Sequence, residues 1–384
     1  MSRERDAWDR ALIGEPGGRE KIETPALILD LDAFERNLHK MAEIAAARKI
    51  ALRPHAKTHK CSTIGRLQMQ AGAIGLCCAK LGEAEVMARA LGGDGVPLLL
   101  ASPQIGSGKI GRLLALNERT DDLMVVLDDA ANAHELAAAT AGRKPLQVLI
   151  DCDVGTHRFG VTSAEQALEL ARIAEGCDTL RLMGVQGYAG HCQAIVDHEE
   201  RRRATTLAIG ILADVRDALR DAGHACPIVT GSGTGTHDAD SKLGVLTDLQ
   251  VGSYIFSDVV YDGIEMAADE PRRFERALFV QTRVVSARQR AYVTTDAGSK
   301  SFSMDGPPPM IVAGAPAGST YGRFGDEFGR VELPDGATPP PIGTLVTCLV
   351  PHCDPTLNLF DAFHCVRGGT LVDIWPIDAR GESG

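Results

Sequence analysis

The chain has 384 residues, 44% of them apolar, which is enough for one large globular domain and a smaller one. Acidic side chains number 51 against 40 lysines and arginines, and the net charge of -11 argues against nucleic acid or an anionic membrane as a partner. The first residues, MSRERDAWDR, lack the apolar core of a signal peptide, and no apolar run reaches the roughly 18 residues of a membrane span. We therefore expect a cytoplasmic protein that acts on a small molecule.

The ten cysteines lie scattered inside apolar runs such as GLCCAK and LIDCD. The sequence contains no CxxC pair, which argues against a four-cysteine zinc site and against a thioredoxin-like redox pair. Buried free thiols fit this distribution better than disulfides do.

A strand and a helix precede the repeating part of the chain. Residues 26–30, ALILD, predict a short strand, and apolar side chains at helical spacing after Asp32 predict a helix that Asp32 caps. This strand is surplus to the eight described next. We expect the N-terminal segment, residues 1–31, to join a β domain.

Eight β-rich runs then alternate with amphipathic helical stretches. The runs cover residues 50–54, 74–79, 96–102, 123–128, 146–153, 182–188, 227–233 and 249–256. They are almost free of interior polar residues, and most begin about 20 to 30 residues apart, a pattern that favours an α/β fold of the (β/α)8 or TIM barrel type over a doubly wound sheet. We assign residues 32–267 to this barrel.

The pattern changes after residue 267. Short alternating runs broken by proline and glycine follow, such as RVVSARQRAYVTTD, PPPMIVAG and GTLVTCLVP. This texture predicts a C-terminal antiparallel β domain over residues 268–384.

In a barrel, the chemistry collects at the carboxyl ends of the strands. Lys57 follows the first run, inside RPHAKTHKC, and Lys60 is its rival for a functional role. If this segment is extended, the two side chains point to opposite faces, so that only one of them faces the barrel. Arg158 follows the fifth run between two glycines, and Tyr188 and His191 follow the sixth.

The seventh run ends in GSGTGT, residues 231–236, which packs three glycines and three hydroxyls into six positions. Such a loop offers N–H and hydroxyl donors to an anion, and late barrel strands are the usual place of a phosphate site. The loop lacks the lysine of a nucleotide P-loop, so a nucleoside triphosphate is the poorer ligand. Gly252, Ser253 and Tyr254 of the eighth run would complete the site.

A lysine at one strand end and a phosphate loop at a late strand together predict a pyridoxal phosphate (PLP) site, where the lysine forms a Schiff base with the cofactor. The plainer alternatives are a solvated lysine at the rim and a merely flexible glycine turn.

The late motif PHCDPTLNLFD is a candidate metal site. If it is extended, His352 and Asp354 share a face and present nitrogen and oxygen ligands, which suit manganese, magnesium or zinc. Water and substrate would complete the coordination, as around a catalytic cation. The alternative is a turn that Asp354 caps.

These motifs resemble the D-threonine aldolase and D-serine dehydratase family of fold type III PLP enzymes, which share the architecture of alanine racemase. The resemblance runs from TPALILDLDAFERNL to WPIDARG and includes RPHAKTHKC, GLCCAKLGEAE, DVGTHRFGV, GSGTGT and VPHCDPTLNLFD. It implies Lys57 as the Schiff-base lysine, Arg158 near the cofactor's phenolate oxygen and a metal on His352 and Asp354. It also implies a homodimer, and a phosphate contacted by Ser232, Gly233, Thr234, Gly235, Gly252, Ser253 and Tyr254.

The resemblance also implies that Asp354 favours an aldolase, since D-serine dehydratases look like HxC, with a cysteine at this position. We expect cleavage of a D-3-hydroxy amino acid, of the D-threonine or D-3-hydroxyaspartate type, into glycine and an aldehyde. The candidate bases are His59, His191 and a hydroxide at the metal, and Gln250 is expected near the pyridine nitrogen. The alternatives are a D-serine or D-3-hydroxyaspartate dehydratase, a racemase and a PLP carrier. Three positions depart from the aldolase pattern, namely Ala79, Ala189 and Ala194.

Overall fold

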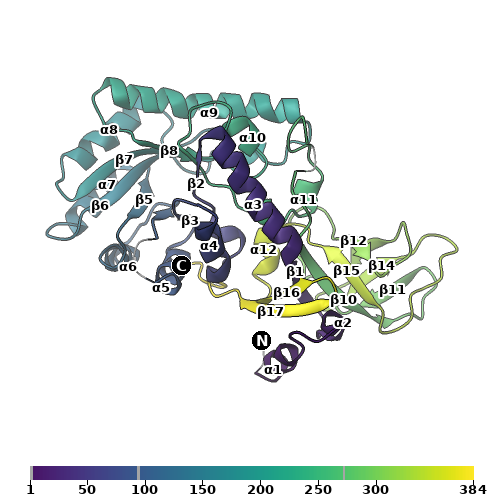
Figure 1. The fold of residues 1–384 in the computed structure, drawn as a ribbon. Coiled ribbons are helices and arrows are strands. Elements are labelled where there is room, and N and C mark those ends of the chain that lie inside the picture. Colours follow the sequence, from purple (N-terminus) through teal and green to yellow (C-terminus); the bar gives the residue numbers. More distant parts are fainter. Residues whose placement is uncertain (1–2, 93–95, 271–272) are drawn as a thin grey trace. The chain divides into compact units, whose positions relative to one another are not determined.

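The computed structural model describes residues 3–92, 96–270 and 273–384, which form two compact units (Figure 1). The barrel unit consists of residues His39–Gly252, the segment that begins at Ile264, and Gly381–Gly384. The β unit consists of the chain up to Leu38, Ser253–Gly263 and the described residues that end at Arg380. Residues 32–38 and 253–263, which the sequence analysis places in the barrel, are thus grouped with the β unit. Among the described residues, no helix combines the length and the apolar character needed to cross a bilayer.

The barrel unit contains a curled sheet of eight parallel strands, in the order β2-β9-β8-β7-β6-β5-β4-β3. The strands are β2 (Ala51–Leu52), β3 (Leu76–Cys78), β4 (Leu98–Leu100), β5 (Leu123–Leu127), β6 (Leu146–Cys152), β7 (Leu180–Gly187), β8 (Ile228–Gly231) and β9 (Asp248–Leu249). Seven of them lie within or largely within a predicted run, whereas β9 shares only Leu249 with the eighth run, residues 249–256, which continues into η3 (Ser253–Ile255). Between the two ends of this order, the N–H of Ile74 donates to Leu52 O and the N–H of Cys77 to Pro54 O, both at 2.8 Å. The predicted (β/α)8 barrel is confirmed.

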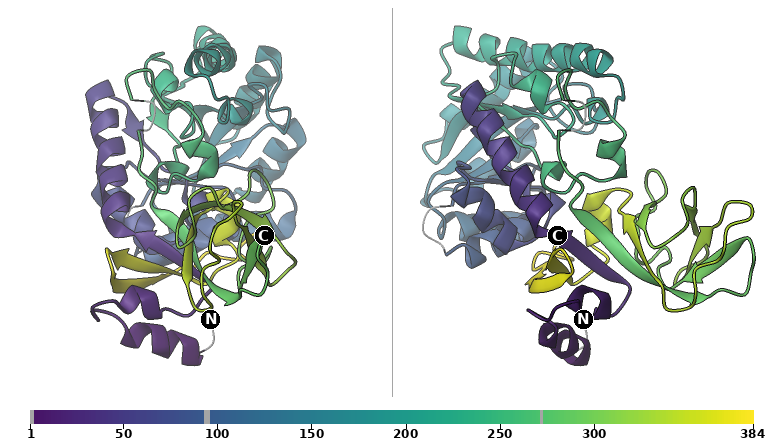
Figure 2. Two further views of the ribbon diagram at one scale, coloured as in Figure 1. Left: turned by 90° about the vertical axis from the view of Figure 1, so that its right-hand side faces the viewer. Right: turned by 45° about the vertical axis from the view of Figure 1, so that its right-hand side comes forward.

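Helices follow the strands and cover the sheet, and Figure 2 shows α8 and α9 on the outer side of the strands. The elements are η1 (Ala56–Thr58), α4 (Ser62–Gln70), α5 (Leu81–Ala90), α6 (Ser107–Asn117), α7 (Ala130–Ala139), α8 (Ala164–Glu175), η2 (Gly190–Cys192), α9 (His198–Asp221) and α10 (His237–Asp240). Several begin at a capping side chain: Asp129 caps α7, Ser163 caps α8 and Asp197 caps α9. The apolar side chains of neighbouring strands pack together in a buried cluster of Cys77, Leu99, Met124, Val126 and Leu149.

The β unit contains a nine-stranded sheet, almost all of it antiparallel. Its strands are β1 (Ala26–Asp30), β10 (Leu278–Ser286), β11 (Tyr292–Thr295), β12 (Met310–Ala313), β13 (Thr320–Arg323), β14 (Gly329–Glu332), β15 (Leu345–Leu349), β16 (Ala362–Arg367) and β17 (Thr370–Pro376). The early strand β1 pairs antiparallel with β10 and parallel with β16. Short helices complete the unit: α1 (Arg3–Ala11), α2 (Gly18–Lys21), η3 (Ser253–Ile255), α11 (Val259–Asp262) and α12 (Cys353–Leu357).

The helix after β1, α3 (Leu31–Arg48), begins two residues earlier than a helix capped by Asp32 would. The cap is Asp30, whose carboxylate accepts the N–H of Ala33 at 3.1 Å. The assignment of Asp32 as the cap is therefore wrong. Asp32 lies in the first turn, where its carboxylate pairs with Arg367.

Candidate active site

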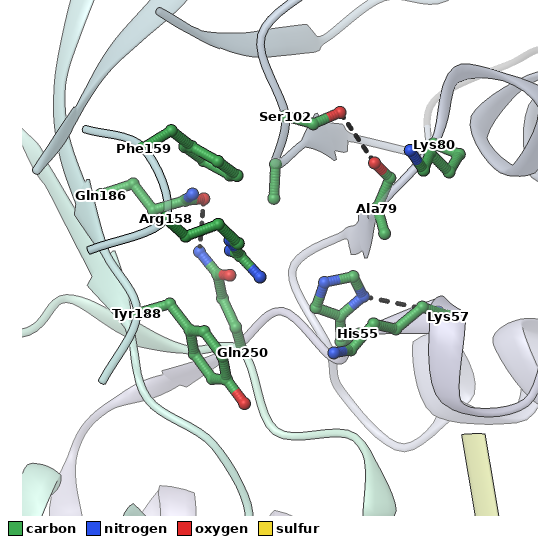
Figure 3. A pocket seen from close by; sticks show the side chains of 11 residues that line it. His55, Lys57, Ala79, Lys80, Ser102, Arg158, Phe159, Gln186, Tyr188 and Gln250 are labelled. Atoms are coloured by element: carbon green, nitrogen blue, oxygen red, sulfur yellow. Dashed lines mark hydrogen bonds between the residues drawn. The ribbon is translucent and has the colours of Figure 1, made fainter. Parts of the chain in front are cut away.

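A cavity of about 220 Å3 lies at the carboxyl ends of the barrel strands (Figure 3). It is lined by His55, Lys57, Ala79, Lys80, Ala101, Ser102, Arg158, Phe159, Gln186, Tyr188 and Gln250. Three of these described lining residues are lysine or arginine, and none is aspartate or glutamate. A cavity with this balance of charge suits an anionic ligand, such as a phosphate or the carboxylate of an amino acid.

Lys57 reaches this cavity from a single helical turn. The residues directly after β2 form η1, which His55 caps by accepting the N–H of Lys57 on its Nδ1 atom at 3.4 Å. The Lys57 ammonium lies 5.6 Å from the centre of the Tyr188 ring. The segment is thus a turn, and the assumption of an extended segment is wrong.

The rival lysine has a structural role. Lys60 adopts a φ of +50°, and its Nζ atom lies 2.8 Å from Glu83 Oε1. The two side chains are only 7% and 2% exposed, so this is a buried ion pair. Lys57, and not Lys60, lines the cavity.

The absence of a side chain at Gly252 lets the chain after β9 pack closely against η1. A Cβ atom on Gly252 would lie 2.3 Å from Thr58 Oγ1. The neighbouring Val251 also accepts the N–H of His55 through its carbonyl oxygen at 3.0 Å. The chain after β9 therefore supports the turn that carries Lys57, and it does so by approaching without a side chain.

His55 is an uncharged neighbour of Lys57. Burial, and then the positive charge of Lys57, lower the pKa of His55 well below its ordinary value. Because Nδ1 accepts the N–H of Lys57, the ring hydrogen is on Nε2. His55 was not among the predicted site residues, although it stands two positions from Lys57.

Arg158 lies beside two aromatic rings. Its guanidinium carbon is 4.4 Å from the centre of the Phe159 ring and 5.8 Å from that of Tyr188. Arg158 and Tyr188 both line the cavity, as does Gln250. The structure thus brings these three predicted residues together with Lys57.

The two predicted histidine bases lie elsewhere among the described residues. His59 is fully buried; its Nδ1 accepts the N–H of Cys61 at 3.1 Å, and its Nε2 lies 3.2 Å from Gln68 Oε1. His191 is exposed, and its ring stands against Gly155, where an added Cβ would lie 2.9 Å from Cε1. Neither imidazole lines the cavity.

The glycine loop after β8 is tightly packed against Gln193. The Gln193 side chain accepts the N–H of Gly235 at 2.9 Å, and a Cβ on Gly233 would lie 2.4 Å from its Oε1 atom. Ser232 adopts a φ of +80°. The hydroxyl of Thr234 is buried, and no partner for it is found within the described part of the chain. A loop of this kind, with an unsatisfied buried hydroxyl, fits a phosphate group.

The floor of the cavity is made by two amides. Gln250 donates from Nε2 to Gln186 Oε1 at 3.0 Å, and Gln186 donates from its own Nε2 to Asp151 Oδ1 at 3.2 Å. Burial raises the pKa of Asp151 to about 8. Gln186 was not predicted, although a glutamine inside the apolar run LMGVQGY is a visible signal.

The remaining predicted residues belong to the β unit. Ser253 and Tyr254 are buried there, and the Tyr254 ring packs edge-on against Phe274 at 5.9 Å. His352 is extended, but Cys353–Leu357 form α12, so that Asp354 stands in the first turn of a helix. The assumption of an extended motif is therefore wrong.

Two carboxylates hold this motif in place. Asp258 accepts the N–H of Cys353 at 2.8 Å, and Asp305 Oδ2 lies 2.7 Å from His352 Nδ1. When His352 Nδ1–H donates to the Asp305 carboxylate, the Nε2 atom of His352 carries the lone pair that a cation needs. Burial raises the pKa of the Cys353 thiol well above its ordinary value, which disfavours it as a ligand. No group of three or more His, Cys, Asp or Glu side chains able to hold a metal occurs among the described residues.

Comparisons with known proteins agree with this picture. Residues 29–258 match the family model described as alanine racemase, N-terminal domain, and residues 277–366 match that of a putative serine dehydratase domain. A D-threonine aldolase of an Arthrobacter species is 39% identical over 96% of this chain and 95% of its own length. A 3-hydroxy-D-aspartate aldolase of Paracoccus denitrificans is 35% identical over the same shares.

A solved structure is similar throughout. The crystal structure of D-threonine aldolase from Filomicrobium marinum superposes with a TM-score of 0.87 at 37% identity, covering 94% of this chain and 96% of that one. The chain thus belongs to the PLP-dependent, alanine racemase-like fold type III family of D-threonine aldolases and D-serine dehydratases.

Proposed function

We propose that this protein is a PLP- and divalent-metal-dependent aldolase that cleaves D-3-hydroxy amino acids of the D-threonine type into glycine and an aldehyde. The observation that carries the proposal is the cationic cavity into which Lys57 projects from the end of β2, in a chain 39% identical to a D-threonine aldolase. The proposal extends to manganese as the cation, to a homodimer and to the cytoplasm. These three rest on the sequence analysis alone.

Three groups of this chain would hold the cofactor. Lys57 would be its covalent anchor, Arg158 would face its ring oxygen, and the buried hydroxyl of Thr234 would bind its phosphate. PLP, when bound, supplies an electron sink for the bond that breaks at Cα. Because His55 is neutral and Lys57 would be joined to the cofactor, Lys80 and Arg158 are the cationic lining side chains that would attract the substrate carboxylate.

His352 and Asp354 would hold the cation, with Asp305 fixing the His352 ring. A divalent cation, when bound, lowers the pKa of a coordinated hydroxyl, which is the activation that aldol cleavage requires. Of the two histidine bases, His191 remains a candidate because its ring is exposed, whereas both ring nitrogens of His59 are engaged with Cys61 and Gln68.

The test is a product analysis. D-Threonine, D-serine and D-3-hydroxyaspartate are supplied separately to the PLP-loaded protein, with manganese and with EDTA. We expect glycine and the matching aldehyde from the first and third substrates, with activity lost in EDTA. A keto acid and ammonia without glycine would identify a dehydratase and refute the aldolase proposal. Inversion at Cα that persists in EDTA would identify a racemase.

A further inference from the structure

We infer that three buried side chains behind the cavity, Arg53, Asp248 and Thr230, orient the Gln250 amide so that it offers a ligand only its carbonyl oxygen. This acceptor selects the form of the cofactor that carries a proton on its ring nitrogen. The inference rests on the proposed PLP-dependent function, and it concerns how Gln250 is positioned rather than which residue anchors the cofactor.

The orientation begins at a buried ion pair. Arg53 Nε lies 3.2 Å from Asp248 Oδ1, and the two side chains are 4% and 2% exposed. The same oxygen lies 2.6 Å from the hydroxyl of Thr230. A carboxylate paired with arginine only accepts hydrogen bonds, so the hydroxyl hydrogen of Thr230 points to Asp248.

The direction of the hydrogen bond from Thr230 to Asp248 determines the direction of the bond between Thr230 and Gln250. Since the Thr230 hydrogen is used, its oxygen accepts, and the Gln250 atom 3.0 Å away from it must be the amide nitrogen. The second hydrogen of that nitrogen goes to Gln186 Oε1, also at 3.0 Å. Figure 3 shows this bond at the cavity wall. Both N–H groups of Gln250 are therefore occupied by the protein.

Only the oxygen of Gln250 remains for a ligand. Cys77 donates to it weakly, with Sγ 3.4 Å from Oε1, and a carbonyl oxygen has a second lone pair. Gln250 follows β9, and β9 lies between β2, which leads into Lys57, and β8, which leads into the glycine loop. Gln250 lines the same cavity as Lys57, and the family resemblance implies that it stands near the ring nitrogen of the cofactor.

Most other polar groups of the cavity are donors or are already engaged: His55 Nδ1 accepts the N–H of Lys57 and Gln186 Oε1 accepts from Gln250, so the Tyr188 hydroxyl is the one further acceptor among the described lining residues. Lys57, Lys80 and Arg158 have donors only, and Ser102 is engaged with Ala79 O. A ring nitrogen facing an acceptor is bound well only when it carries a proton. The protonated ring is the stronger electron sink, so this orientation favours the proposed cleavage.

The test uses holoenzyme loaded with PLP that is labelled with 15N at the ring nitrogen, and the 15N signal is compared with those of free cofactor in its protonated and neutral forms. The wild type and Thr230→Ser, which keeps the hydroxyl, are expected to show the protonated signal. Thr230→Val keeps the shape but leaves one N–H of Gln250 without its acceptor. In Thr230→Val, the 15N signal of the bound PLP should therefore move toward that of the neutral form, and PLP binding should weaken about five- to tenfold.

A purely structural role of Thr230 would lower stability in Thr230→Val without moving the 15N signal, and that outcome overturns the inference. If Thr230→Val does not fold, the wild type and Gln250→Glu, which keeps an acceptor, still decide the question. A neutral ring nitrogen in either of them overturns the inference while leaving the PLP proposal standing. A wild type that gains no visible absorbance with PLP refutes the proposed function itself.

Discussion

Replacing Gly252 by alanine tests whether the chain after β9 supports the turn that carries Lys57. The added Cβ would stand 2.3 Å from Thr58 Oγ1, 3.2 Å from Thr58 Cβ and 3.5 Å from His55 O. Thr58 is 1% exposed, so it has little free space into which to move. Restoring even a 3.0 Å separation requires a displacement of roughly 0.7 Å, and overpacking of this kind costs about 1–3 kcal/mol.

We therefore expect Gly252→Ala to lower the free energy of unfolding by about 2 kcal/mol and to weaken PLP binding, because Thr58 lies next to Lys57. Thr58→Ala removes the clashing oxygen. In that background the same glycine substitution should cost roughly 1 kcal/mol or less, which is a coupling of about 1–2 kcal/mol. Urea unfolding of the four proteins measures the coupling, and spectrophotometric titration measures PLP affinity.

Gly210 offers a matched control. It lies inside α9, and a Cβ there would meet no atom within 4 Å. Gly210→Ala should therefore stabilise the protein by about 0.5–1 kcal/mol through helix propensity alone. If Gly252→Ala lowers the free energy of unfolding equally in the wild type and in the Thr58→Ala background, the steric reasoning is refuted.

Three further predictions concern charged groups. Lys57→Ala should abolish the visible absorbance of bound PLP, whereas Lys60→Ala should keep it. Lys60→Ala should also lower the free energy of unfolding by about 3–5 kcal/mol, because Glu83 is left as a buried unpaired charge. The reverse pattern of absorbance would make Lys60 the anchor. Asp354→Ala should keep PLP absorbance and lose most of the manganese-dependent activity; loss of the cofactor would contradict a purely catalytic cation. Because burial raises the pKa of Asp151 to about 8, its proton stabilises the folded state fully below the ordinary pKa of about 4, and this contribution is lost as the pH rises through about 8. In urea unfolding between about pH 5 and pH 9, wild-type stability should fall relative to Asp151→Asn; a difference independent of pH would contradict the shift.

Local pattern was sufficient for the barrel. The eight strands of the curled sheet overlap the eight apolar runs, β9 by Leu249 alone, because buried parallel strands need side chains that are apolar on both faces. The same pattern located Lys57, Arg158 and Tyr188, since in a parallel sheet the residues at the strand ends meet at one edge, whereas Gln250 was expected from the family resemblance.

Local pattern was insufficient wherever a contact joins distant parts of the chain. The sequence allowed Lys60 as the cofactor anchor, but in the structure Lys60 forms a buried ion pair with Glu83. The sequence also allowed His59 as a catalytic base, but both of its ring nitrogens have hydrogen-bond partners in the structure. A turn at η1 and a helix at α12 stand where two extended segments were expected, and tertiary hydrogen bonds hold both, from the N–H of His55 to Val251 O and from the N–H of Cys353 to Asp258.

The sequence by itself determined the barrel, the β domain and the family, because periodic burial and short motifs are properties of neighbouring residues. Only the tertiary structure decided which face each polar side chain presents. Arg53 lies 195 positions from Asp248, and the direction in which Gln250 points depends on that pair. Hydrogen-bond direction passes from partner to partner through space, and no spacing along the chain encodes it.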